Sequence, residues 1–281
     1  MTIRGWFFLA SLAFPVFFSV LDLNAQTGGD FGDETALYAE TKQVNQFFRR
    51  FNCEEGRNGE RFYPGNPLYR DPEFRLGYLE ILFDGESSSI VPADKQDFIR
   101  HVCKPDLPTY LNFHGGEWLA EVNTRFLYEG SERELTLFMR LEADRLGHKW
   151  VIDRVQFAPY MKRFSQRPAG ETEFLHPLSH ELDFMNLSKV FRSSKDLQGY
   201  VPADYEPDQL TLFLLDVAAG KLTFRTVTNM RFHFFQVEGW YFELRDLQRA
   251  GYNTGWLITR LERVSPEERT LLLRDIYHAT R

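Results

Sequence analysis

Residues 118–157 read WLAEVNTRFLYEGSERELTLFMRLEADRLGHKWVIDRVQF. Within this stretch, segments rich in β-branched and aromatic residues alternate with short polar turns that contain glycine. Such segments favour strands, and turns of this kind favour antiparallel neighbours. The stretch therefore predicts a three-stranded meander, with strands over 118–128, 135–141 and 150–157.

Helices are predicted on both sides of this meander. Before it, apolar residues recur at three- and four-residue spacings, as they do in amphipathic helices. After a linker over 158–173 that contains proline and glycine, helices again precede strands. The predicted helices cover 33–51, 72–83, 92–102, 181–191 and 207–219, the further strands cover 222–228, 231–237, 240–244 and 256–261, and Ser265 caps a last helix.

Two patterns of the first half recur in the second half at the same offset of 106 residues (229 − 123 and 256 − 150). The matched pairs are Asn123 with Asn229, Arg125 with Arg231, Phe126 with Phe232, and Trp150 with Trp256. This recurrence predicts an α+β chain of two similar units, 34–160 and 175–264, followed by a C-terminal helix over 265–281. A pseudo-two-fold axis would relate them as an intramolecular pseudo-dimer. Chance matching of aromatic-rich strands is the alternative.

Helices followed by such strands resemble the cystatin-like, nuclear-transport-factor-2-like α+β cone. The strand sequence 118–157 and the segment that begins Gly255-Trp256 are similar to the terminal strands of that superfamily. The resemblance implies helices packed on a strongly bent antiparallel sheet, in an exported protein of the kind found in Bacteroidetes-type bacteria. Its steroid-isomerase members need a Tyr, a protonated acid and a carboxylate base. No such trio matches by position here, so that activity is not carried over.

The N-terminal segment predicts export. Arg4 supplies a positive charge, residues 6–21 are mostly apolar, and Ala25 is a small residue at a cleavage position. This is the pattern of a secretory signal peptide over 1–25, before a flexible leader over 26–33. We therefore expect a periplasmic or extracellular protein with no membrane span after signal removal. An uncleaved membrane anchor is the alternative.

Composition narrows the classes of partner. The formal net charge is −7, and charges of both signs are interspersed without a basic run. This disfavours nucleic-acid binding. The 27 phenylalanines indicate a Phe-rich core more than an aromatic ligand site. The sequence shows no phosphate loop, dinucleotide fingerprint or nucleophile elbow, so it predicts no cofactor and no catalytic residue.

One candidate ligand site is a polar cluster that begins His176-Pro-Leu-Ser-His180. Histidines four residues apart share one face of a helix, where a carboxylate could complete a metal site. Pro177 indicates, however, that His176 precedes the helix, and His180 also fits a capping role. The cluster is kept as a ligand-binding candidate, and no metal is predicted.

A second candidate surface contains Arg231, His233 and Trp240. Strand alternation places Phe232 and Phe234 on one face of the sheet and Arg231 with His233 on the other. A sheet with aromatic residues on both faces should be covered on both. The alternative is that His233 is a packed histidine in the core.

Cys53 and Cys103 are the only cysteines. In an oxidising compartment they could pair. Two buried thiols are the alternative, because sequence alone cannot place two Cα atoms within disulfide reach.

These observations predict a non-catalytic binding or protein-interaction module of the cell envelope. Its partner would be an envelope protein or a small ligand. Two alternatives stay open: an isomerase- or hydrolase-like enzyme that uses a cone-shaped pocket, and a structural part of a surface assembly.

Overall fold

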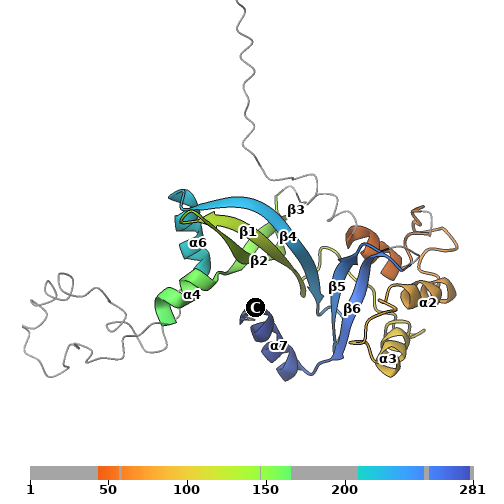
Figure 1. Cartoon of the computed structure of the whole chain (residues 1–281). Helices are drawn as coiled ribbons and strands as arrows, with labels where there is room; N and C mark the ends of the chain where they lie inside the picture. Colours follow the sequence, from red (N-terminus) through yellow and green to blue (C-terminus); the bar gives the residue numbers. More distant parts are fainter. Residues whose placement is uncertain (1–43, 57–58, 146, 166–207, 250–252, 279–281) are drawn as a thin grey trace, which may run out of the picture. The chain divides into compact units, whose positions relative to one another are not determined.

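The computed structural model describes residues 44–56, 59–145, 147–165, 208–249 and 253–278, and Figure 1 shows their arrangement. The first described element is a helix over residues 44–51. The other elements are, in chain order, α2 (Pro72–Ile81), α3 (Pro92–Val102), β1 (Trp118–Tyr128), β2 (Ser131–Asp144), β3 (Gly147–Gln156), α4 (Ala158–Ser165), α6 (Gln209–Ala218), β4 (Leu222–Phe234), β5 (Trp240–Leu247), β6 (Gly255–Arg263) and α7 (Pro266–His278). The signal segment, the leader and the predicted helix over 181–191 lie outside the described residues.

All six strands form one antiparallel sheet in the order β3-β2-β1-β4-β5-β6. The α+β class is therefore confirmed, but the prediction of two separate units is wrong. The two meanders join where β1 pairs with β4, from Trp118 opposite Phe234 to Tyr128 opposite Leu222. In a separate unit, β1 would be an edge strand with unpaired backbone N–H and C=O groups, which favour aggregation. Pairing with β4 satisfies these groups.

The predicted strands over 222–228 and 231–237 form the single strand β4, which ends at Phe234. The pairing of β1 with β4 shifts its register after Asn123, so that Thr228 is an extra residue beside Asn229. Such a bulge keeps a strand continuous while it increases the local twist. A second difference is α4, a helix that begins inside the predicted linker.

The sheet has two different faces. The face that carries Phe232 and Phe234 is here called the core face, and the face that carries Arg231 and His233 is called the polar face. On the core face, aromatic rings are stacked closely, and the rings of Phe234 and Phe242 lie 4.7 Å apart at 3°. Phe47 of the first helix contacts both of these rings.

Helices from each half of the chain pack on strands of the other half. The N-terminal helices cover the second meander: Phe98 of α3 contacts Trp240 at 5.4 Å, and the Ile258 amide donates to the Leu82 carbonyl at 2.8 Å. In the opposite direction, Phe213 of α6 contacts Phe126 of β1 at 5.7 Å. Each half therefore buries part of its apolar face with helices of the other half, which is a second reason why two separate units do not form.

Arg75 of α2 ties the N-terminal helices together. Its side chain is 1% exposed, and its guanidinium donates to the carbonyls of Phe51 and Val102 at 2.9 Å each, and to that of Thr109. Phe51 and Val102 are the last residues of their helices, where backbone carbonyls lack partners within the helix and carry partial negative charge. One buried cation thus fixes both helix ends.

The polar face is covered in part by α7. Ser265 begins this helix with the expected cap: its hydroxyl accepts from the Glu268 amide at 3.2 Å, and the Glu268 carboxylate accepts from the Ser265 amide at 2.8 Å. Ile276 of α7 joins a small apolar cluster with Leu119, Phe138, Phe235 and Tyr241. α7 thus covers part of this face, in line with the expectation that both faces of the sheet are covered.

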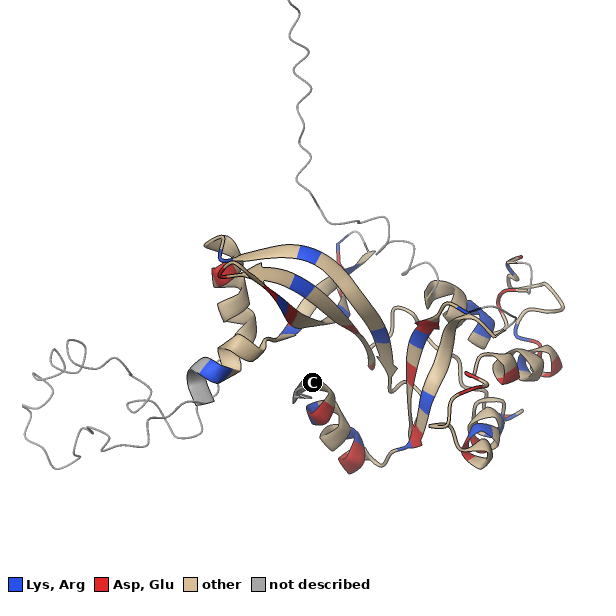
Figure 2. Ribbon diagram, in the orientation of Figure 1, with Lys and Arg blue, Asp and Glu red and all other residues tan. Residues whose placement is uncertain are grey.

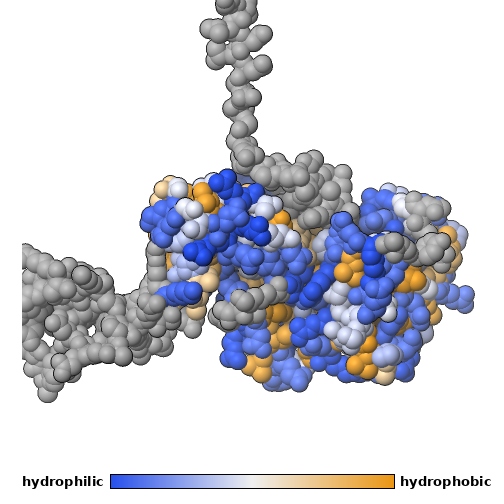
Figure 3. All heavy atoms as spheres, viewed as in Figure 1, coloured by the Kyte–Doolittle hydropathy of each residue, from blue (hydrophilic) through white to orange (hydrophobic). Residues whose placement is uncertain are grey.

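Within the described residues, no helix has the length and apolar character needed to cross a membrane. Figure 2 shows acidic and basic residues interspersed along the strands and helices. Figure 3 shows a largely hydrophilic surface on the same side, with apolar residues in small groups.

Candidate functional site

A buried network of ionisable side chains lies on the polar face. Its members come from three neighbouring strands: Glu121 from β1, Arg231 and His233 from β4, and Tyr241 and Glu243 from β5. None of these residues is more than 7% exposed. The register brings them together, because Glu121 lies opposite Arg231 and His233 lies opposite Glu243.

His233 links a phenol to a carboxylate. Its Nδ1 atom lies 2.8 Å from the Tyr241 hydroxyl, and its Nε2 atom lies 3.0 Å from Glu121 Oε2. Burial, followed by the charge of Glu243, raises the pKa of Tyr241, so the phenol keeps its proton at neutral pH. In the tautomer that carries its hydrogen on Nε2, the imidazole accepts from the Tyr241 hydroxyl and donates to Glu121. This chain of donors fixes the position of the Glu121 carboxylate.

Arg231 lies between two carboxylates. Its Nε atom is 3.5 Å from Glu121 Oε2, and its Nη1 atom is 3.6 Å from Glu243 Oε2. Glu243 also accepts from Arg245 Nε at 2.5 Å, at the edge of the network. Burying these charges is costly unless each has a partner, and the arrangement supplies one for each.

A cavity of ≈ 800 Å³ extends from Glu121 along the polar face, between the sheet, α4 and Ile276 of α7. Its floor is polar. The Thr136 hydroxyl donates to Asn123 Oδ1 at 2.8 Å, and the Asn123 amide lies 3.4 Å from Glu121 Oε1. The bulge residue Thr228 also lines the cavity, and its hydroxyl donates to the Asn123 carbonyl at 3.1 Å. Bulges commonly turn side chains toward sites in this way.

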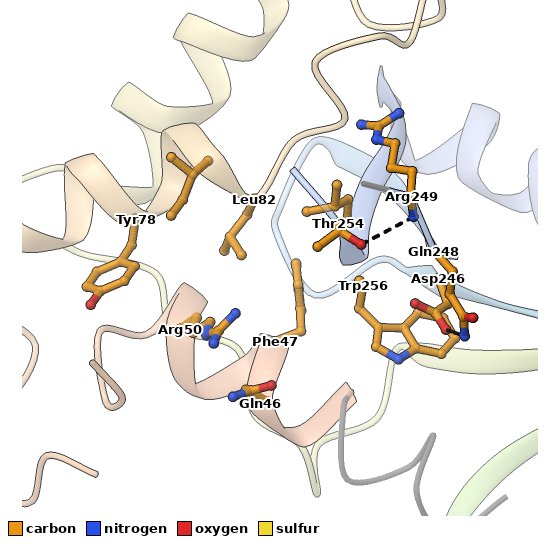
Figure 4. Close-up of a pocket in the computed structure, with 13 residues that line it drawn as sticks. Gln46, Phe47, Arg50, Tyr78, Leu82, Asp246, Gln248, Arg249, Thr254 and Trp256 are labelled. Atoms are coloured by element: carbon orange, nitrogen blue, oxygen red, sulfur yellow. Dashed lines mark hydrogen bonds between the residues drawn. The ribbon is translucent and has the colours of Figure 1, made fainter. Parts of the chain in front are cut away.

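A second cavity of ≈ 810 Å³ lies between the first helix, α2 and the β5–β6 hairpin (Figure 4). Phe47, Tyr78 and Trp256 are among the residues that line it. The charge of Arg249 is already matched, because its guanidinium contacts Asp84 at 2.6 Å and Glu86 at 3.0 Å. Figure 4 also shows its backbone amide directed to the Thr254 hydroxyl. Since this cavity does not adjoin the network around Glu121, we take the cavity on the polar face as the candidate site.

The site residues that were predicted from the sequence do not all lie in one place in the structure. Arg231 and His233 lie together on the polar face, as the alternation predicts. Trp240 lies on the core face, buried under the Arg263 guanidinium at 4.5 Å, and does not join them. His176 and His180 lie outside the described residues.

Sequence reasoning missed Glu121 and Glu243. Two signals were present: each glutamate is a single acidic residue inside an otherwise apolar strand segment, LAEV for Glu121 and YFEL for Glu243. A buried acid needs a cationic or hydrogen-bonding partner, so both should have been assigned to the same face as Arg231.

Cys53 and Cys103 are both free thiols in the structure. Burial raises the pKa of each, and the charge of Asp71 adds to the effect at Cys53. The Cys53 thiol contacts the Leu68 carbonyl at 3.5 Å. A raised pKa keeps both in the thiol form at neutral pH, which is not the state of a nucleophile.

Among the described residues, no group of three or more His, Cys, Asp or Glu side chains is placed to hold a metal ion. No family model, no curated protein and no solved structure matches this chain. The function is therefore argued from the site alone.

Proposed function

We propose that this chain is an exported, non-catalytic binding module that holds a small, uncharged polar ligand in the cavity on the polar face. The observation that supports it most is the fixed position of the Glu121 carboxylate, which His233 and Arg231 hold from one side while the residue lines the cavity. Groups held in place before binding lose little entropy when a ligand arrives.

The lining indicates the class of ligand. Besides Glu121, the lining combines the amides of Asn123 and Asn229 and the hydroxyls of Thr136 and Thr228 with charged side chains of both signs, among them Arg133, Glu134 and Lys162. These groups both donate and accept hydrogen bonds, which suits hydroxyl- or amide-bearing molecules such as sugars, polyols or short peptides. A volume of ≈ 800 Å³ falls within the range of small-molecule pockets.

The enzyme alternative is less well supported. His233 is 2% exposed and Tyr241 is fully buried, so neither can touch a substrate. Glu121 is then the single member of the network that both lines the cavity and could act as an acid or base. General acid–base catalysis requires the catalytic group to reach the proton that it moves.

The proposal is tested by a thermal-shift screen with sugars, polyols, amino acids and dipeptides. Each compound that stabilises the wild-type protein is then titrated against Thr136→Val, which removes one cavity hydroxyl without changing the side-chain volume much. We expect weaker binding, by about tenfold, since an unpaired polar group costs about 1–3 kcal/mol.

Thr254→Val is the matched control, because it removes a hydroxyl from the second cavity. Its affinity for the same compounds should equal that of the wild-type protein. The proposal fails if no compound binds, or if Thr254→Val weakens binding while Thr136→Val does not.

A further inference from the structure

Two histidine rings meet on the surface, away from both cavities. His114 belongs to the loop before β1, and His148 is the second residue of β3. Their ring centroids lie 4.3 Å apart with an interplanar angle of 34°. Both residues are exposed, and within the described part of the chain no hydrogen bond or ion pair involves a nitrogen of either ring.

Both rings stand on supports that other contacts hold in place. The amide of Gln236 donates to the carbonyls of Asn112 and Gly116 at 2.8 Å each, which closes the loop around His114. The His114 amide also donates to Asn112 Oδ1 at 3.0 Å. His148 lies opposite Ala143 in the β2–β3 ladder. The proximity of the two rings is therefore set by the fold.

We propose that His114 and His148 form a two-imidazole site for a divalent transition metal ion. Metal–nitrogen distances of about 2.0–2.1 Å place two neighbouring ligating nitrogens roughly 2.9 Å apart at a square-planar angle and roughly 3.3 Å apart at a tetrahedral angle. With ring centroids 4.3 Å apart and an interplanar angle of 34°, rotation about χ2 can bring one nitrogen of each ring to such a separation. Water completes the coordination, so the site keeps open positions.

The chemistry of the donors defines which ions bind. Imidazole suits Cu²⁺, Zn²⁺ and Ni²⁺, and affinity for a given nitrogen site is highest for Cu²⁺ in this series. Only neutral imidazole ligates, so protons compete with the metal ion for both rings. This site is separate from the cavity on the polar face and does not rest on the function proposed for it.

The test uses Cu²⁺ alone and the wild-type protein with the variants His114→Gln and His148→Gln. Isothermal titration gives the affinity, and electron paramagnetic resonance counts the nitrogen ligands. We expect two nitrogen ligands in the wild-type protein. Each variant should bind at least about tenfold more weakly, since even loss of an outer partner of a ligating histidine costs roughly 10–100-fold.

The matched controls are His101→Gln, a lone histidine on α3, and the double variant His176→Gln/His180→Gln. Both should bind Cu²⁺ like the wild-type protein, and circular dichroism confirms that every variant is folded. The proposal is overturned if the wild-type protein binds no Cu²⁺, if His114→Gln and His148→Gln both bind normally, or if the double variant abolishes binding.

Discussion

Replacing Arg231 by Met tests whether the buried network on the polar face is a true charge network. Arg231 is 6% exposed and lies between Glu121 at 3.5 Å and Glu243 at 3.6 Å. Its removal leaves two buried carboxylates without their shared cation. Breaking a buried pair in this way costs about 3–5 kcal/mol. We expect the lower end of that range, because Glu121 keeps His233 and Glu243 keeps Arg245.

The free energy of unfolding is measured by urea titration with tryptophan fluorescence, since Trp118, Trp240 and Trp256 are buried and report on the core. The control is Arg125→Met, whose exposed ion pair with Glu132 at 3.7 Å should contribute at most about 1 kcal/mol.

A second comparison separates charge from shape. Glu121→Gln removes one of the two carboxylate charges, so the double variant Glu121→Gln/Arg231→Met should lose less stability than the sum of the two single variants. A coupling energy of about 0.5–3 kcal/mol is expected for groups in contact. If Arg231→Met costs no more than Arg125→Met, or if the two effects add, the network does not hold the polar face together as described.

Tyr241→Phe should cost about 1–2 kcal/mol at pH 8, because the His233 Nδ1 atom loses its partner at 2.8 Å. Burial raises the pKa of Tyr241, so just above pH ~10 only the unfolded chain releases the phenol proton, and the stability of the wild-type protein falls as the pH rises. The urea midpoint of Tyr241→Phe should therefore fall less between pH 8 and 10.5 than that of the wild-type protein. Equal falls would contradict the raised pKa of Tyr241. Burial raises the pKa of Cys53 and Cys103, so iodoacetamide should label both thiols slowly at pH 8 in the folded protein and rapidly in urea. Labelling at equal rates in the two states would refute their burial. Each half of the chain, divided within 161–174, should remain unfolded by circular dichroism when expressed alone, because its apolar sheet face needs helices from the other half; a folded half would restore the model of two units.

Local structure was largely predictable from the sequence. The helix over 92–102 was predicted at its observed bounds, and the strand over 118–128 likewise. Both have a clear local pattern: amphipathic spacing after a proline in the helix, and β-branched and aromatic residues before a glycine turn in the strand. Alternation along 231–235 also predicted which side chains share a face, because the side-chain period of a strand is two.

The joining of the two halves was not predictable in the same way. Asn123 lies opposite Asn229 where β1 meets β4, and no local pattern encodes a pairing between residues so far apart in the chain. The matched positions of the two halves do lie in equivalent strands of the sheet, with Trp150 in edge strand β3 and Trp256 in edge strand β6. The internal repeat stays a prediction.

The candidate site was predicted only in part for the same reason. Arg231 and His233 were identified because they are close in sequence, whereas their partner Glu121 lies on another strand. Trp240 was included by sequence proximity, but strand alternation places it on the core face. Cross-strand partners decide the chemistry of a sheet face, and they depend on the register.

The most direct measurement of the central claim is an amide chemical-shift map of the ¹⁵N-labelled protein, titrated with the compound that binds most tightly in the thermal-shift screen. If the polar face holds the ligand, the largest shifts will fall on Glu121, Asn123, Thr136 and Thr228. Shifts that gather instead on Phe47, Tyr78 and Trp256 of the second cavity would contradict it.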